Sequence, residues 1–205
     1  MWAATFSLLS SLKKYIDLLA NTQVQSFPLA LDGRPRMAFG NKEIPQTTRK
    51  CACRNETLIG HYNDQPHQFD GEQYSGYYTQ EEAREVVKYA ADRSITVIPE
   101  IDMPGHAMAA VAAYPKLGCT GNQVEPARIW GEHEDIFCSN EATFEFLKKV
   151  LTEVMAIFPS KYIHIGGEEC PKSQWVASKL CQDIIKKEGL KDENENELQS
   201  FLYRG

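Results

Sequence analysis

The sequence contains no apolar run of the roughly 18 residues that a transmembrane helix needs, and no cluster of lysine and arginine. Its 205 residues are 42% hydrophobic and 24% charged, and they carry a formal net charge of −6. This composition is typical of a folded globular chain, long enough for one well-packed domain and short for two. The mildly acidic charge argues against nucleic acid as a partner and suits a neutral or cationic small substrate.

The sequence also lacks a GxGxxG loop, a P-loop and a CxxC pair. A nucleotide site therefore has no support, and Cys51 and Cys53 are too close together for a common zinc knuckle. A secretory signal carries its positive charge in front of an apolar stretch. Lys13 and Lys14 lie behind the short apolar stretch at the N-terminus, so the sequence shows no clear signal peptide and predicts no compartment.

The cysteines support two interpretations, which the sequence leaves open. One is that all of them are free thiols or members of the core. The other is a disulfide between Cys119 and Cys138, which would close a loop if the chain is in an oxidising compartment. The six cysteines are Cys51, Cys53, Cys119, Cys138, Cys170 and Cys181.

Residues 1–53 show no steady helical or strand period beyond a weak amphipathic stretch at residues 8–19. We leave this segment unassigned and expect it to be loosely packed or disordered, or to lie outside the main domain. The domain itself is expected over residues 54–205. No transmembrane span is expected in either part.

A regular alternation of helix and strand begins near residue 79. Thr79 followed by glutamate three positions later predicts a helix N-cap. Two β-rich runs end in acids, residues 95–102 (ITVIPEID) and residues 162–169 (YIHIGGEE). Further helices are expected at 107–114, after an N-cap at Asn140, and over 173–188, where Gly189 stops the helix. This order is typical of parallel βαβ units.

The predicted fold class is α/β, a partial (β/α)8 TIM barrel with parallel strands. Acids at the carboxyl ends of parallel strands occupy the catalytic face of such a barrel. An open doubly wound sheet is the alternative, because it places ligands at the same strand ends.

The first candidate site is residues 99–106 (PEIDMPGH), a turn-rich segment after the first strand. Asp102 can orient His106 and hold its proton on the far ring nitrogen. The alternative is that these side chains only stabilise the loop through hydrogen bonds.

The second candidate site is residues 164–169 (HIGGEE). The two glycines allow close approach of the backbone to a ligand or to a neighbouring strand. In a closed pocket, repulsion between Glu168 and Glu169 keeps a proton on one of them, and a carboxyl protonated near neutral pH is a general acid. The alternative is two solvated acids at the start of a helix, where the helix dipole favours them.

Several separated motifs resemble the family 20 glycoside hydrolases, the β-N-acetylhexosaminidases. The resemblance runs from about residue 54 to residue 202. Its motifs are residues 76–82 (GYYTQEE), 97–106 (VIPEIDMPGH), 114–119 (YPKLGC) and 164–167 (HIGG) followed by two acids. Residues 170–172 (CPK), 189–193 (GLKDE) and 198–200 (LQS) resemble bacterial members.

The resemblance implies hydrolysis of terminal non-reducing N-acetylhexosamine by a substrate-assisted retaining mechanism, an exception to the common two-carboxylate scheme. It implies that Glu169 is the proton donor and that Glu168 orients the acetamido group of the sugar. His106 and Asp102 match the residues that support the acid and line the pocket. The expected partner is a glycan containing an aminosugar, with no metal or organic cofactor. Oligomeric state is not predicted.

The chain departs from the family pattern in three ways. The family has Asp where this chain has Glu168, and a displaced carboxylate of about 1 Å can cost roughly a hundredfold in rate. No match is found for the family's first-strand arginine. Only two βα units are legible, so we expect a partial barrel. An inactive remnant that still binds an aminosugar, or a truncated non-functional fragment, is the alternative function.

Overall fold

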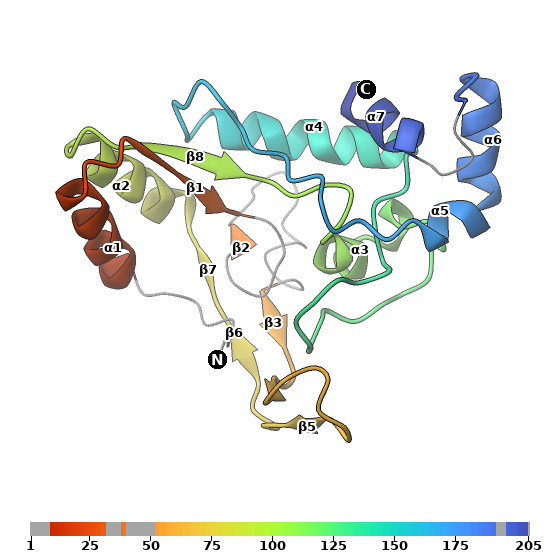
Figure 1. The fold of residues 1–205 in the computed structure, drawn as a ribbon, viewed down its shortest axis with the longest axis horizontal. Coiled ribbons are helices and arrows are strands. Elements are labelled where there is room, and N and C mark those ends of the chain that lie inside the picture. The colour runs from red at the N-terminus through yellow and green to blue at the C-terminus, as the bar shows by residue number, and fades with distance from the viewer. Residues whose placement is uncertain (1–8, 32–37, 40–51, 192–195, 205) are drawn as a thin grey trace.

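The computed structural model describes residues 9–31, 38–39, 52–191 and 196–204 (Figure 1). The helices are α1 (Leu9–Asn21), α2 (Gln80–Ala91), α3 (Met108–Ala113), the 3-10 turn η2 (Pro115–Leu117), α4 (Glu141–Met155), α5 (Ser173–Ala177), α6 (Lys179–Lys187) and α7 (Asn196–Arg204). The strands are β1 (Ser26–Ala30), β2 (Ala38–Phe39), β3 (Cys53–Arg54), β4 (Leu58–Ile59), β5 (Gln68–Phe69), β6 (Tyr74–Ser75), β7 (Tyr77–Tyr78) and β8 (Thr96–Glu100).

Parallel pairing of β1 with β8 is the longest strand pairing that the structure describes. The register places Phe27 beside Val97, and both side chains are buried. On the other edge of β8, Glu100 forms a parallel bridge with His164, and the backbone N–H of Ile101 donates to the His164 carbonyl at 2.9 Å. The parallel arrangement predicted from the alternation of helix and strand is therefore present.

The predicted cap of α2 is confirmed in detail. The Thr79 hydroxyl accepts a hydrogen bond from the Glu82 N–H at 3.1 Å, and the Glu82 carboxylate accepts from the Thr79 N–H at 2.8 Å. This reciprocal capping box satisfies two backbone donors that the first turn would otherwise leave unpaired. The apolar face of the helix, which includes the buried Val86 and Ala90, then packs into the core.

Residues 9–31 correct the expectation of loose packing in the N-terminal segment. Helix α1 buries Leu12 and Ile16 against the main core. On the surface, Asp17 of α1 accepts hydrogen bonds from Tyr89 at 3.0 Å and from Arg93 at 2.5 Å. The weak amphipathic period was therefore a genuine helix signal. Most of residues 32–51 lie outside the described residues, so the expectation is not tested there.

The helix predicted over 173–188 is two helices. Ser178 takes an extended conformation between α5 and α6, and its hydroxyl accepts from the Cys181 N–H, so it is the N-cap of α6. The break lets Trp175 of α5 bury completely, with its indole N–H donating to the Phe137 carbonyl at 2.8 Å. Hydrophobic periodicity carries no signal for such a break, because both helices keep an apolar face.

The strand predicted at residues 162–169 is reduced to the single bridge at His164, and the described strands do not close a barrel. The bridge ends where positive φ angles at Gly166 and Gly167 turn the chain away from β8. Two short antiparallel pairs, β3–β6 and β4–β5, form an arm that the sequence did not predict. Among the described residues, no helix is both long and apolar enough to span a bilayer.

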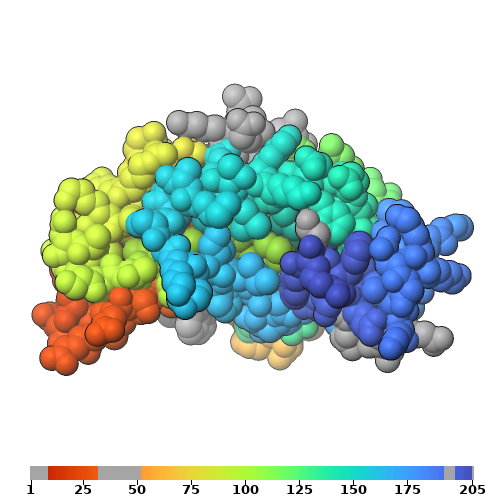
Figure 2. Space-filling model, turned by 90° about the horizontal axis from the view of Figure 1, so that it is seen from above, coloured from red at the N-terminus to blue at the C-terminus, as the bar shows by residue number. Residues whose placement is uncertain are grey.

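Seen from above, α1 and α2 lie at one end of the molecule, and α5 and α6 form the opposite end (Figure 2). Helix α4 lies between them and contributes Phe146, Leu147 and Val154 to the main core. A second, smaller core forms around Trp175, under α5, α6 and α7. The loop that follows β8 contributes Ile101, Met103 and Ala107 to the main core, whereas Cys170, in the loop after the His164 bridge, packs against the smaller one.

Candidate active site

The two loops singled out by sequence meet through a direct contact between side chains. His106 Nε2 lies 2.9 Å from Glu169 Oε2. The His106 side chain is 8% exposed, whereas that of Glu169 is 51% exposed. A buried imidazole that contacts one carboxylate oxygen holds the carboxyl in place and leaves the rest of the group accessible from solvent.

Asp102 is 3% exposed and links its own loop to the backbone of the other loop. Its Oδ1 accepts a hydrogen bond from the Gly167 N–H at 3.3 Å. The interaction predicted for this carboxylate was orientation of His106, and that role stays a prediction. The bond to Gly167 fixes the backbone that leads to Glu169.

The glycines make this approach possible, as the sequence predicted. Gly166 has a φ of +65°, and a Cβ placed there would lie 1.6 Å from Asp102 Oδ1. In the other loop, a Cβ on Gly105 would lie 2.9 Å from the Glu169 carbonyl oxygen. The two loops are therefore packed backbone against backbone, and neither position can accept a side chain without movement of the other loop.

Both members of the contact pair hold a backbone conformation that side chains disfavour. His106 has a φ of +52° and Glu169 a φ of +51°. A non-glycine residue in this region costs of the order of 1–3 kcal/mol, and such residues cluster at functional sites. Here the strain occurs at the two residues whose side chains meet.

Glu168 is exposed and takes no part in this contact. Within the described residues it makes no hydrogen bond or ion pair. Its charge lies close enough to Tyr203 to contribute to the raised pKa of that phenol, which burial mainly causes. The closed pocket expected around the adjacent acids is therefore absent from the described residues, and the two carboxyls have different surroundings.

Helix α7 adds two residues that the sequence did not identify as part of the site. The Tyr203 hydroxyl donates to the Met103 carbonyl at 3.0 Å, and the Gln199 amide donates to the Gly167 carbonyl at 2.7 Å and to Tyr203 Oη at 2.7 Å. The two side chains are one helical turn apart and so contact both loops from one face. That spacing was the available signal, but it is also common in helices without such a role.

Two further residues near the site have shifted pKa values. Burial raises the pKa of Cys170 to about 11, with a smaller contribution from Asp102, so this thiol stays protonated near neutral pH and is a poor nucleophile. Burial also lowers the pKa of His133, and the nearby His106 lowers it further. Sequence reasoning did not identify His133, which has no motif around it.

Comparison with known proteins agrees with the motifs. The family model described as "Glycosyl hydrolase family 20, catalytic domain" matches residues 2–204. A β-hexosaminidase from Porphyromonas gingivalis is 43% identical over 97% of this chain and 24% of its own length. The crystal structure of a β-N-acetylhexosaminidase from Bacteroides fragilis superposes with a TM-score of 0.76 at 40% identity, over 96% of this chain and 35% of that one.

A third relative is an exo-β-N-acetylglucosaminidase from Vibrio harveyi, crystallised in complex with N-acetylglucosamine. It is 31% identical with a TM-score of 0.75, over 94% of this chain and 30% of its own. The chain thus spans a quarter to about a third of the length of these relatives. The division of the chain between residues 53 and 54 stays a prediction, although the family match includes the N-terminal segment. From the match over residues 2–204, the chain belongs to glycosyl hydrolase family 20, within its catalytic domain.

Proposed function

We propose that this chain carries the acid end of an active site that hydrolyses terminal non-reducing N-acetylhexosamine from β-N-acetylhexosaminides. The observation that carries the proposal is the 2.9 Å contact between His106 Nε2 and Glu169 Oε2. It joins the loops after two parallel strand segments, which is where a (β/α)8 barrel places its catalytic groups. We propose that the parallel strands of this chain are part of such a barrel.

In the proposed mechanism, Glu169 donates its proton to the glycosidic oxygen as the bond to the anomeric carbon breaks. The carbonyl oxygen of the substrate's own 2-acetamido group attacks the anomeric carbon and forms an oxazolinium ion. Water then adds to the anomeric carbon and opens the ring, and its proton returns to Glu169. Two displacements at one carbon give net retention, and the chain itself supplies no nucleophile.

The surroundings of the two glutamates suit different roles in this scheme. Glu169 is held by His106, which can keep the acid aimed at the leaving oxygen. Glu168 is exposed, so it is available to accept the acetamide N–H and to balance the positive charge of the ring. Asp102 acts on neither reacting atom, and we assign it a positioning role through Gly167.

The substrate class has support from the Vibrio harveyi relative, which was crystallised with N-acetylglucosamine. An N-acetylated aminosugar brings its own nucleophile, the oxygen of its acetamido group. This fits the neighbouring thiol of Cys170, which burial keeps protonated by raising its pKa to about 11.

The test is hydrolysis of two chromogenic substrates that differ only at carbon 2. One is a β-N-acetylglucosaminide and the other the matching β-glucoside, which lacks the acetamido group. The proposal expects turnover of the first and none of the second. Equal turnover of both would contradict substrate assistance. Binding of N-acetylglucosamine without turnover of either, in a chain shown to be folded by circular dichroism, would identify an inactive sugar-binding remnant.

A further inference from the structure

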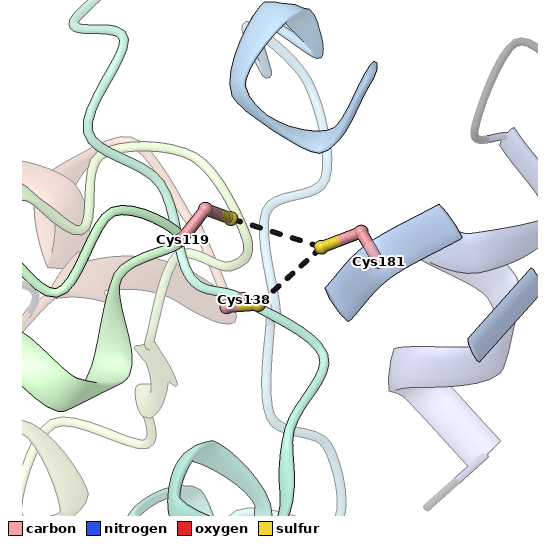
Figure 3. Close-up of side chains that lie close together, drawn as sticks. All are labelled: Cys119, Cys138 and Cys181. Atoms are coloured by element: carbon pink, nitrogen blue, oxygen red, sulfur yellow. Dashed lines mark hydrogen bonds between the residues drawn. The ribbon is translucent and has the colours of Figure 1, made fainter. Parts of the chain in front are cut away.

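Three cysteine side chains converge beside the first turn of α6 (Figure 3). The sulfurs of Cys119, Cys138 and Cys181 all lie within 4.8 Å of one another. The Cys181 sulfur is 3.3 Å from that of Cys138 and 3.9 Å from that of Cys119. The three residues come from separate segments: the turn after η2, the loop before α4 and the first turn of α6.

The cluster is shielded from water on most sides. Cys138 and Cys181 have no exposed surface, and they pack with Ile136, Trp175 and Ile185 in the smaller core. Cys119 is partly exposed, which leaves a path by which a small ion can enter. The two buried thiols are 43 residues apart in the sequence, so no local spacing pattern marks them.

Polar groups converge on one of the three sulfurs. The Cys181 sulfur lies 3.3 Å from that of Cys138 and 3.9 Å from that of Cys119, so either neighbouring thiol can donate a hydrogen bond to it, and such a donor stabilises a thiolate. The position of Cys181 in the first turn of α6 also favours a thiolate. Backbone bonds such as Cys138 N–H to the Leu117 carbonyl, at 2.8 Å, fix the loops around it.

All five cysteines that the structure describes are free. The Cys119–Cys138 disulfide left open by the sequence is therefore not formed, and Cys138 lies close to Cys181 instead. Their separation of 3.3 Å is well beyond the roughly 2.05 Å of a disulfide bond. Four sulfurs around a zinc ion at about 2.3 Å lie roughly 3.8 Å apart, the edge of a tetrahedron. The measured separations of 3.3 and 3.9 Å lie around that value.

We propose that Cys119, Cys138 and Cys181 bind a thiophilic divalent cation of the zinc class, at a site separate from the acid loops. On binding, the protons of Cys119 and Cys138 pass to solvent and the three sulfurs coordinate as thiolates. The Ser178 hydroxyl or a water molecule takes the fourth position. The ion joins α6 to the two loops that lead into and out of the smaller core, so its role is structural.

Cadmium is the probe, because the charge-transfer absorption of its thiolate complexes lies at longer ultraviolet wavelength than that of zinc thiolates, where the peptide backbone absorbs little. The full chain, purified with a reductant that is then removed under argon, is titrated with Cd²⁺ alone. The expected result is about one ion per chain. Zn²⁺ should compete for the same site, and addition of Zn²⁺ should raise the melting temperature of the chain.

Three variants separate this site from adventitious thiol binding. Cys181→Ser should lower Cd²⁺ affinity by roughly 100-fold or more, since loss of even an outer-shell partner costs about 10- to 100-fold. Cys119→Ser, at the partly exposed position, should do the same with less risk to folding. Cys53→Ser removes a free thiol on β3 outside the cluster and should leave the titration unchanged.

A gain-of-affinity variant completes the test. Ser178→Cys adds a fourth thiol beside Cys181, three positions earlier, which is the spacing of common zinc ligands. It should tighten binding by roughly tenfold or more. The proposal is overturned if fully reduced parent protein binds no Cd²⁺, or if Cys181→Ser and Cys119→Ser, both folded by circular dichroism, bind it as tightly as the parent.

Discussion

The two acid-bearing loops both follow a parallel strand segment, but their acids differ in exposure to solvent. Residues 101–106 and 166–169 each follow a segment of parallel strand pairing at Glu100 and His164. In the first loop Asp102 is 3% exposed, whereas the Glu169 side chain in the second loop is 51% exposed. The buried acid makes a hydrogen bond to the backbone of the other loop, and the exposed acid contacts His106.

Two similar sequence patterns thus place one acid that holds the structure of the site and one that can take part in its chemistry. A buried carboxylate with a backbone partner holds a shape, because removing it would leave an unpaired donor in the interior. An exposed carboxyl held by one imidazole can exchange a proton with a substrate. We therefore expect changes at the buried Asp102 and at the glycine packed against it to act on stability and geometry, and changes at the exposed acids to act on chemistry.

The largest effect is expected from Glu169→Gln. The amide keeps the size of the side chain and removes the proposed proton donor, so kcat on an N-acetylglucosaminide should fall by roughly 10²- to 10⁴-fold. Substrates with poor leaving groups should suffer most. Glu145→Gln, an exposed acid on α4, is the matched control and should be neutral. An unchanged kcat in Glu169→Gln would refute its assignment as the acid.

Gly166→Ala should reveal the packing between the loops. The new Cβ would lie 1.6 Å from Asp102 Oδ1 and 3.1 Å from its Cα, so the buried carboxylate would have to leave its place and the backbone would have to shift slightly. Gly121→Ala is the control: its φ of +68° is similar, and nothing lies within 4 Å of its Cβ. Both changes should cost about 1 kcal/mol for the left-handed backbone, and Gly166→Ala roughly a further 1–3 kcal/mol. Chemical denaturation measures the difference, and equal losses would contradict tight packing.

Glu168→Asp tests the second role in the exposed loop. The family pattern has the shorter acid here, and the exposed Glu168 carboxylate has room to move. If its reach is misplaced by about 1 Å, shortening it should raise kcat/KM by roughly 10- to 100-fold. The gain should also appear in kcat, because the charge that Glu168 balances develops in the transition state. A fall in kcat/KM would show that the longer acid is the fitted one.

How much of this the sequence could predict depended on whether the signal was local. The capping box at Thr79, the N-cap at Asn140 and the strand ending at Glu100 are local, and each was found. The contact of His106 with Glu169 followed from parallel strands that end at the same edge. The break at Ser178 was missed, since an extended serine leaves the apolar period of both helices intact.

Contacts between segments that are distant in the sequence could not be predicted from it. Tyr203 contacts Met103 across 100 positions, and only the folded chain brings them together. The cysteine cluster joins residues that are 43 and 62 positions apart, so no CxxC spacing marks it in the sequence. The packing of α1 was underestimated because a weak amphipathic period gives no information about the partner helix that buries it.

Thr79→Ala should have the smallest effect, and it decides whether the loops are special. The change removes the hydroxyl that caps α2, whose hydrogen bonds are to Glu82, at a cost of about 1 kcal/mol. For a chain of this size the melting temperature should fall by roughly 2–4 °C. Activity well below that temperature should be unchanged, because neither acid moves. If kcat instead fell together with the melting temperature, the sensitivity of the loops would reflect marginal stability of the whole chain rather than their own packing.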